Sequence, residues 1–95
     1  MESVYQKALQ AELVKAGFKA ETECALKVNY KGTVVGNFAA DLLVNDVVLV
    51  ELKVAKNYNA EDEAQLLNEL KASGIKVGLL INFGRTKVEF KRMVF

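Results

Sequence analysis

A short apolar run that ends in a carboxylate and an ammonium is the feature that most constrains this chain. Val47-Val48-Leu49-Val50 has the character of a buried strand, and Glu51-Leu52-Lys53 follows it directly. Residues i and i+2 of a strand point to the same face, so Glu51 and Lys53 share one side of a sheet. Asp41 is close enough in the chain to join them across a hairpin. Two carboxylates beside a lysine suit a divalent metal and a hydrolytic water.

The pattern of apolar residues predicts a single domain with the element order α-β-β-β-α-β-β. Apolar residues recur at helical spacing in two segments, and the remaining segments are rich in apolar and β-branched residues. The predicted helices are 2–17 and 60–73, and the predicted strands are 19–30, 33–44, 47–54, 77–83 and 86–95. The link from 54 to 77 is long enough for a parallel crossover, so the sheet should be mixed and flanked by two helices. The strand at 77–83 should be covered on both faces, and the last strand should lie at an edge.

The ends of both predicted helices carry recognisable signals. Gly17 and Gly74 are suited to helix C-termini, and Asn59 is suited to cap the second helix. Ser3 and Gln6 fit a capping box that would leave Glu2 just outside the first helix. In the second helix, we expect the buried positions to be Ala60, Ala64, Leu67 and Leu70.

The register of the 33–44 and 47–54 hairpin decides whether a site can form. A two-residue turn at Asn45-Asp46 would pair position 41 with 50 and point Asp41 away from Glu51. A three-residue loop over 44–46, with Asp46 at positive φ, would pair 43 with 47 and 39 with 51. Asp41 would then lie on the same face as Glu51, roughly 7–8 Å away along the diagonal. We therefore predict an odd-length loop or a bulge.

Composition excludes several classes of protein. The 95 residues are 52% hydrophobic, which supports a folded core. The absence of histidine and the single Cys24 exclude Ser-His and Cys-His catalysis, a cysteine zinc cluster and an internal disulfide within one chain. No run is long enough to span a membrane and no signal peptide is evident, so a cytoplasmic location is expected. The net charge of +1 requires any phosphate-binding surface to be local.

These segments together resemble a known family. Asp41 followed by Glu51-Leu52-Lys53 on an αβββαβ frame resembles the PD-(D/E)XK nuclease superfamily, and the chain resembles its GxxExxY proteins more closely. The matching segments are Glu2-Ser3-Val4-Tyr5, Tyr30-Lys31-Gly32, Asp41-Leu42-Leu43-Val44, Val50-Glu51-Leu52-Lys53, Glu63-Ala64-Gln65-Leu66-Leu67 and Gly78-Leu79-Leu80-Ile81-Asn82-Phe83. The resemblance covers nearly the whole of residues 1–95. It implies a restriction-endonuclease-like α/β fold that lacks the family's usual segment before Glu2.

The resemblance also implies a metal-dependent phosphodiesterase that acts on nucleic acid, which we expect to be DNA. Asp41 and Glu51 would bind Mg²⁺ or Mn²⁺, the Leu52 carbonyl would add a ligand, and Glu2 would complete the site. Lys53 would activate the attacking water and stabilise charge on the phosphate, and Gln65 of the second helix would face the same centre. We expect Lys53, together with the three other cations Lys56, Arg85 and Lys87, to contact nucleic acid.

The chain departs from the family pattern at three positions. It has Ala39, Asp62 and Glu69 where the family often has arginine, histidine and tyrosine, and these changes are expected at the periphery of the site. They motivate an alternative, in which a catalytically inactive module of the same fold binds nucleic acid or a protein partner.

Simpler interpretations stay open for individual residues. Lys53 could equally be a salt-bridge partner or a catalyst. Glu2 also fits a solvated terminus, and Gln65 also fits an exposed helix residue. The apolar C-terminal residues also fit a homodimer.

Overall fold

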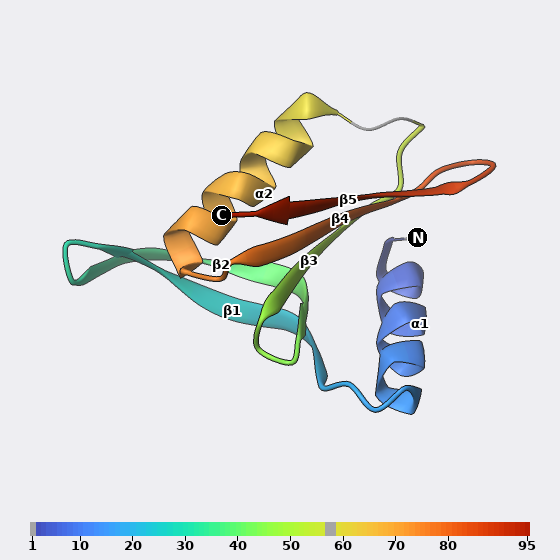
Figure 1. Ribbon diagram of the computed structural model, residues 1–95, viewed down its shortest axis with the longest axis horizontal. Helices are drawn as coiled ribbons and strands as arrows, with labels where there is room; N and C mark the ends of the chain where they lie inside the picture. Colours follow the sequence, from blue (N-terminus) through green and yellow to red (C-terminus); the bar gives the residue numbers. More distant parts are fainter. Residues whose placement is uncertain (1, 57–58) are drawn as a thin grey trace.

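The computed structural model describes residues 2–56 and 59–95 and has the predicted order of elements. Two helices and five strands are present, and each lies within about two residues of its predicted bounds (Figure 1). The elements are α1 (Glu2–Lys15), β1 (Ala20–Tyr30), β2 (Thr33–Val44), β3 (Val48–Lys53), α2 (Ala60–Ser73), β4 (Val77–Phe83) and β5 (Val88–Val94). Neither helix is long and apolar enough to cross a membrane, among the residues described.

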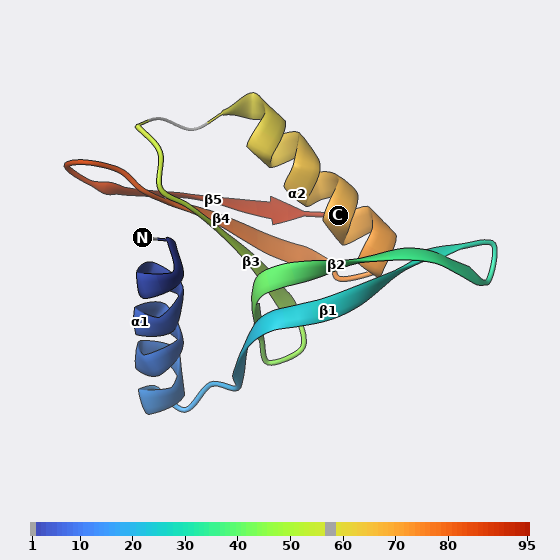
Figure 2. The ribbon, with the colours of Figure 1, turned by 180° about the vertical axis from the view of Figure 1, so that it is seen from behind.

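The five strands form one mixed sheet in the order β1-β2-β3-β4-β5. Only the β3–β4 pair is parallel, because α2 carries the chain back to the start of the sheet between these strands. The other neighbours are antiparallel, and β5 lies at the edge, as predicted. Figures 1 and 2 place α1 and the tip of the β1–β2 hairpin at opposite ends of the molecule.

The helices cover opposite faces of the sheet. On the α1 face, Leu42, Val50 and Leu52 are buried against Leu9 and Leu13. On the α2 face, the buried cluster is Ala40, Leu49, Leu66, Leu70 and Leu80. Burying a leucine of this kind contributes about 1.5–3 kcal/mol, so the clusters fix each helix against the sheet. The two faces of β4 contribute to different clusters, as its apolar sequence predicted.

The capping signals are confirmed in part. Gly17 at φ +93° ends α1 with hydrogen bonds from Gly17 N–H to the Val14 carbonyl and from Phe18 N–H to the Leu13 carbonyl, the Schellman arrangement. Asn59 caps α2 through Glu61 N–H, and Gly74 ends it at positive φ. The capping-box prediction was wrong, because the helix already includes Glu2 and the Gln6 side chain is buried and bonded elsewhere.

The predicted buried face of α2 was wrong except at Leu70. Ala60, Ala64 and Leu67 are exposed, and Leu66 is buried instead. The positions that flank the Leu66–Leu70 stripe are acidic. Asp62 and Glu63 are half-buried there because they pair with Lys53 and Lys91. The spacing of apolar residues alone therefore predicted a buried face of α2 that is rotated about the helix axis from the observed one.

The β2–β3 loop is odd-length, as the site required. It spans residues 45–47, one position later than expected, and pairs Val44 with Val48 and Leu42 with Val50. Asn45 and Asp46 both have positive φ, at 52° and 61°. The predicted pairs 43–47 and 39–51 are therefore wrong by one residue on each strand. Continued by one position, the observed register sets Asp41 opposite Glu51 on the same face.

Candidate active site

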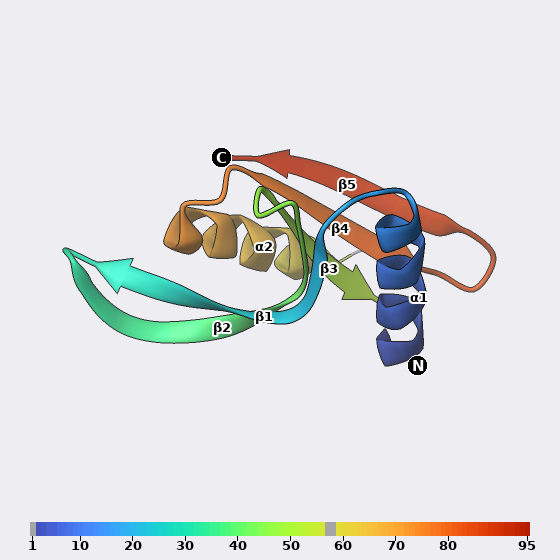
Figure 3. The same cartoon turned by 90° about the horizontal axis from the view of Figure 1, so that it is seen from below.

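The sheet divides where β2 leaves β3, and Asp41 lies at that point. The β2–β3 ladder ends at Leu42 and Val50, and the Asp41 side chain then accepts a hydrogen bond from Leu52 N–H at 2.8 Å. Gln6 of α1, only 6% exposed, donates from Nε2 to the Asp41 carbonyl at 2.8 Å. Asp41 is thus held from both sides. The curvature of the β1–β2 hairpin around α2 is visible in Figure 3.

Glu51 and Glu69 bring two more carboxylates to the same place. Glu51 lies on the α2 face of β3, and Glu69 lies on the third turn of α2. Burial, followed by the nearby charges of Glu69 and Asp41, raises the pKa of Glu51 from 4.5 to about 8. Burial, followed by the charge of Asp41, also raises the pKa of Glu69. Within the described residues, one carboxylate oxygen of each glutamate is buried without a hydrogen-bond partner.

Lys53 lies on the same face as Glu51 and pairs with α2. Its Nζ is 3.6 Å from Asp62 Oδ1, and both side chains are partly buried. The salt-bridge interpretation of Lys53 is therefore observed. It does not exclude a catalytic role, because a pair at this distance leaves N–H donors for another acceptor.

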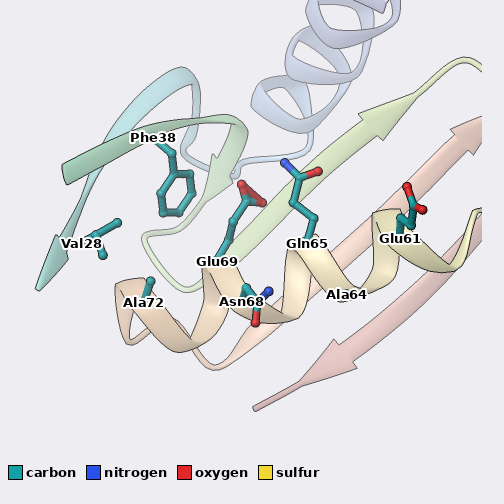
Figure 4. Close-up of a pocket in the computed structure, with 8 residues that line it drawn as sticks. All are labelled: Val28, Phe38, Glu61, Ala64, Gln65, Asn68, Glu69 and Ala72. Carbon is teal, nitrogen blue, oxygen red and sulfur yellow. The ribbon is translucent and has the colours of Figure 1, made fainter. Parts of the chain in front are cut away.

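The remaining predicted site residues border the same centre. Gln65 is exposed on α2, and it lines a cleft together with Glu69. Its side chain points into this cleft (Figure 4). Glu2 is exposed, as the solvated alternative expected, but it lines a cavity of about 260 Å³ together with Gln6 and Asp41. Leu52 contributes its N–H to Asp41, and its proposed carbonyl ligand remains a prediction.

The other predicted cations lie beyond the ends of β3 and β4. Lys56, Arg85 and Lys87 line a hollow of about 490 Å³. The buried Asn82 joins the adjacent ends of β3 and β4, since its side chain accepts from Ala55 N–H and donates to the Ala55 carbonyl, both at 2.9 Å. The hollow is thus a local basic surface on a nearly neutral protein, and it also includes Glu89.

The donor set at the centre suits a hard divalent cation. Among the residues described, no three His, Cys, Asp or Glu side chains form a ready-made metal centre. Mg²⁺ nevertheless retains several waters and needs only one or two carboxylates, and Asp41 and Glu51 supply them. A bound cation would also stabilise the unpartnered buried oxygens of Glu51 and Glu69. The residues present therefore fit Mg²⁺ or Mn²⁺.

Comparison with known families agrees with this geometry. The model of a family described as the PD-(D/E)XK nuclease superfamily matches residues 1–93. The chain belongs to this superfamily. Its members generally use divalent metals and act on nucleic acids. No curated protein is similar enough to count as a match.

A solved structure confirms that the fold is shared. The superfamily domain resembles the structure titled "Crystal structure of SSO0001" with a TM-score of 0.71 and 18% sequence identity. The match covers 97% of this chain and 50% of that one, so the chain spans about half the length of that protein.

Two residues of the centre were not predicted as part of it. Glu69 was expected at the periphery, yet its carboxylate adjoins those of Glu51 and Asp41. Gln6 was assigned to a helix cap and instead holds Asp41. Glu69 could have been found from its spacing, because it lies four residues after Gln65 and so shares its side of α2. Nothing in the sequence indicated the partner of Gln6.

Proposed function

We propose that this superfamily domain is a metal-dependent nuclease that hydrolyses the phosphodiester bonds of nucleic acid, with DNA as the substrate we expect. The observation that supports this most is the juxtaposition of Asp41 and Glu51, in which Asp41 is held by Leu52 N–H and Gln6. A structural ion pair would not need two acidic side chains on one face, nor carboxylate oxygens that are buried without a partner. A cation site uses both, because the carboxylate oxygens are its ligands.

In this proposal, Asp41 and Glu51 hold Mg²⁺ or Mn²⁺, with the Leu52 carbonyl and Glu2 as further ligands. Such an ion, when bound, acts as a Lewis acid and makes water a stronger nucleophile. Lys53 donates to a phosphate oxygen and offsets the charge that develops there, while Asp62 fixes its side chain. Gln65 orients the attacking water from α2.

The backbone of the nucleic acid would lie on the basic hollow. Lys56, Arg85 and Lys87 supply three positive charges next to the ends of β3 and β4, and Lys53 continues this surface toward the carboxylates. Phosphate contacts of this kind position a strand without reading its sequence. Binding should therefore weaken steeply as the salt concentration rises.

Calorimetry with Mg²⁺ and Mn²⁺, in parallel with cleavage of labelled single-stranded and duplex DNA, tests the proposal. Glu51→Ala should lose both metal binding and cleavage while it keeps its fold by circular dichroism. Asp41→Asn is the better variant on β2, because its side-chain oxygen still accepts from Leu52 N–H. Glu12→Ala, on the exposed side of α1, is the matched control. Residual cutting by a clean Glu51→Ala preparation would refute the assignment.

One observation favours the inactive alternative. Lys53 is paired with Asp62, and the GxxExxY proteins often have histidine at the position of Asp62. This pairing makes Lys53 less available to a phosphate. A module of this kind would bind nucleic acid or a protein partner without cleaving DNA. Asp62→Asn distinguishes the two functions, since freeing Lys53 should raise cleavage in an active enzyme and leave a binding module unable to cut. The resemblance to the GxxExxY group is likewise part of the proposal.

We also propose a homodimer through β5. This edge strand exposes Val88, Phe90 and Val94, and Phe90 is 72% exposed. If two copies pair antiparallel about Phe90, the rings meet and Glu89 lies opposite Lys91 of the second copy. An edge strand that is both apolar and charge-complementary to itself fits such a contact.

A further inference from the structure

A cleft next to the carboxylates has no role in the proposed chemistry so far, apart from Gln65 at its edge. It has a volume of about 480 Å³ and lies between α2 and the β1–β2 hairpin (Figure 4). Val28 and Phe38 line the hairpin side, and Gln65 and Asn68 are among the residues that line the helix side. Glu69 lines the cleft and also adjoins Glu51, so the cleft opens directly from the proposed metal centre.

The two walls differ in chemistry. The hairpin wall is apolar, and Phe38 packs partly against the core of the α2 face while its ring also borders the cleft. The helix wall carries the amides of Gln65 and Asn68, which can both donate and accept hydrogen bonds. Glu61 and Glu69 also line the cleft, and their carboxylates would repel a phosphate there.

A nucleobase has the properties that these walls require. Its faces are apolar and stack on aromatic rings, its edges carry donors and acceptors that match amides, and it has no charge for Glu61 or Glu69 to repel. A phosphate at the Asp41–Glu51 centre would leave the neighbouring base at the mouth of the cleft. In a duplex that base is paired and stacked on both sides, so it could enter only after leaving the helix.

We propose that this cleft takes one unpaired base next to the scissile phosphate, stacked on Phe38 with its edge bonded by Gln65 or Asn68. The substrate class is therefore single-stranded or end-frayed nucleic acid. This inference rests on the proposed function only in taking a nucleic acid as the ligand. It concerns binding, so it is tested without cleavage.

The test measures binding of a labelled single-stranded oligonucleotide, the matching blunt duplex, and a series in which an abasic residue replaces each nucleotide in turn. The single strand should bind roughly 5- to 150-fold more tightly than the duplex, the range expected for loss of one base–aromatic stack. One abasic position should weaken binding by a similar factor. A 2-aminopurine at that position should lose fluorescence on binding, because it stacks.

Phe38→Leu should weaken binding of the intact strand by the same factor and leave binding of the critical abasic strand unchanged. Phe38→Trp, which keeps a stacking surface, should restore binding and shows that a loss in Phe38→Leu is not misfolding. Phe18→Leu is the matched control, because this exposed ring follows α1 and does not line the cleft.

The proposal is overturned if the abasic series binds uniformly, if the duplex binds as tightly as the single strand, or if no oligonucleotide binds. Cleavage of single and duplex DNA at equal rates would reject the base site and leave the nuclease function intact. Binding that depends on Phe38 and on one base, without any cleavage, would support the base site and reject hydrolysis.

Discussion

Replacing Glu51 with glutamine should stabilise the protein, and the gain should depend on pH. Glutamine keeps the size and hydrogen-bonding capacity of the side chain and removes its charge. The pKa of Glu51 is raised from 4.5 to about 8 by burial and by Glu69 and Asp41. The charged form is therefore the one that the folded state disfavours.

The sign follows from linkage between protonation and folding. Below pH 4.5, Glu51 is protonated in both the folded and unfolded chains and has no effect on stability. Between pH 4.5 and about 8, the unfolded chain releases the proton and the folded chain keeps it, so stability falls as pH rises. At about 1.36 kcal/mol for each pH unit, the full interval corresponds to roughly 5 kcal/mol at most.

Glu51→Gln lacks this titration. Its advantage over the wild type should be close to zero at pH 4 and reach about 2–5 kcal/mol at pH 8.5. Urea denaturation across this pH range measures it, with Glu12→Gln on the exposed side of α1 as the control. Mg²⁺ added at pH 8.5 should narrow the gap, because it stabilises the charged wild-type site. A Glu51→Gln protein that is equally stable or less stable at pH 8.5 would show that Glu51 is satisfied as a carboxylate.

Three further predictions concern packing and assembly. Asn82→Ala should cost about 2–4 kcal/mol in urea denaturation, because it removes both hydrogen bonds to the Ala55 backbone at a fully buried position. Gly78→Ala should cost about 1–3 kcal/mol by the same measurement, since its Cβ would lie 3.1 Å from a Leu70 methyl carbon; an unchanged midpoint would contradict the packing of α2 on β4. Phe90→Glu should convert a dimer to a monomer in light scattering without loss of secondary structure, and a wild type that is already monomeric would reject the β5 contact.

The sequence predicted the elements well because their signals are local. Asn59 and Gly74 mark the ends of α2 by their own backbone chemistry, and the β-strands follow from runs of apolar residues. The odd β2–β3 loop was predicted from the requirement that Asp41 and Glu51 share a face. The predicted position of the loop was wrong by one residue. The prediction gave positive φ to Asp46 alone, whereas both Asn45 and Asp46 adopt it.

The site was predicted less completely because its remaining parts depend on tertiary contacts. The orientation of α2 was missed because the residues beside its apolar stripe are acidic and take partners on other strands, Asp62 with Lys53 and Glu63 with Lys91. The same rotation brings Glu69 to Glu51. When a helix contributes acidic residues to a site, its buried face is partly polar. Apolar spacing alone then fails to identify that face.

Asp41 links the fold of the sheet to the proposed chemistry. Its carboxylate accepts Leu52 N–H at the point where the β2–β3 ladder ends, so the side chain replaces a strand partner that has moved away. This divergence frees the β1–β2 hairpin to curve around α2 and form the cleft lined by Phe38. An aspartate that both closes the sheet and faces Glu51 explains how 95 residues can hold several carboxylates together. Loss of activity in Asp41→Ala would mix the two roles, whereas Asp41→Asn preserves the acceptor and isolates the charge.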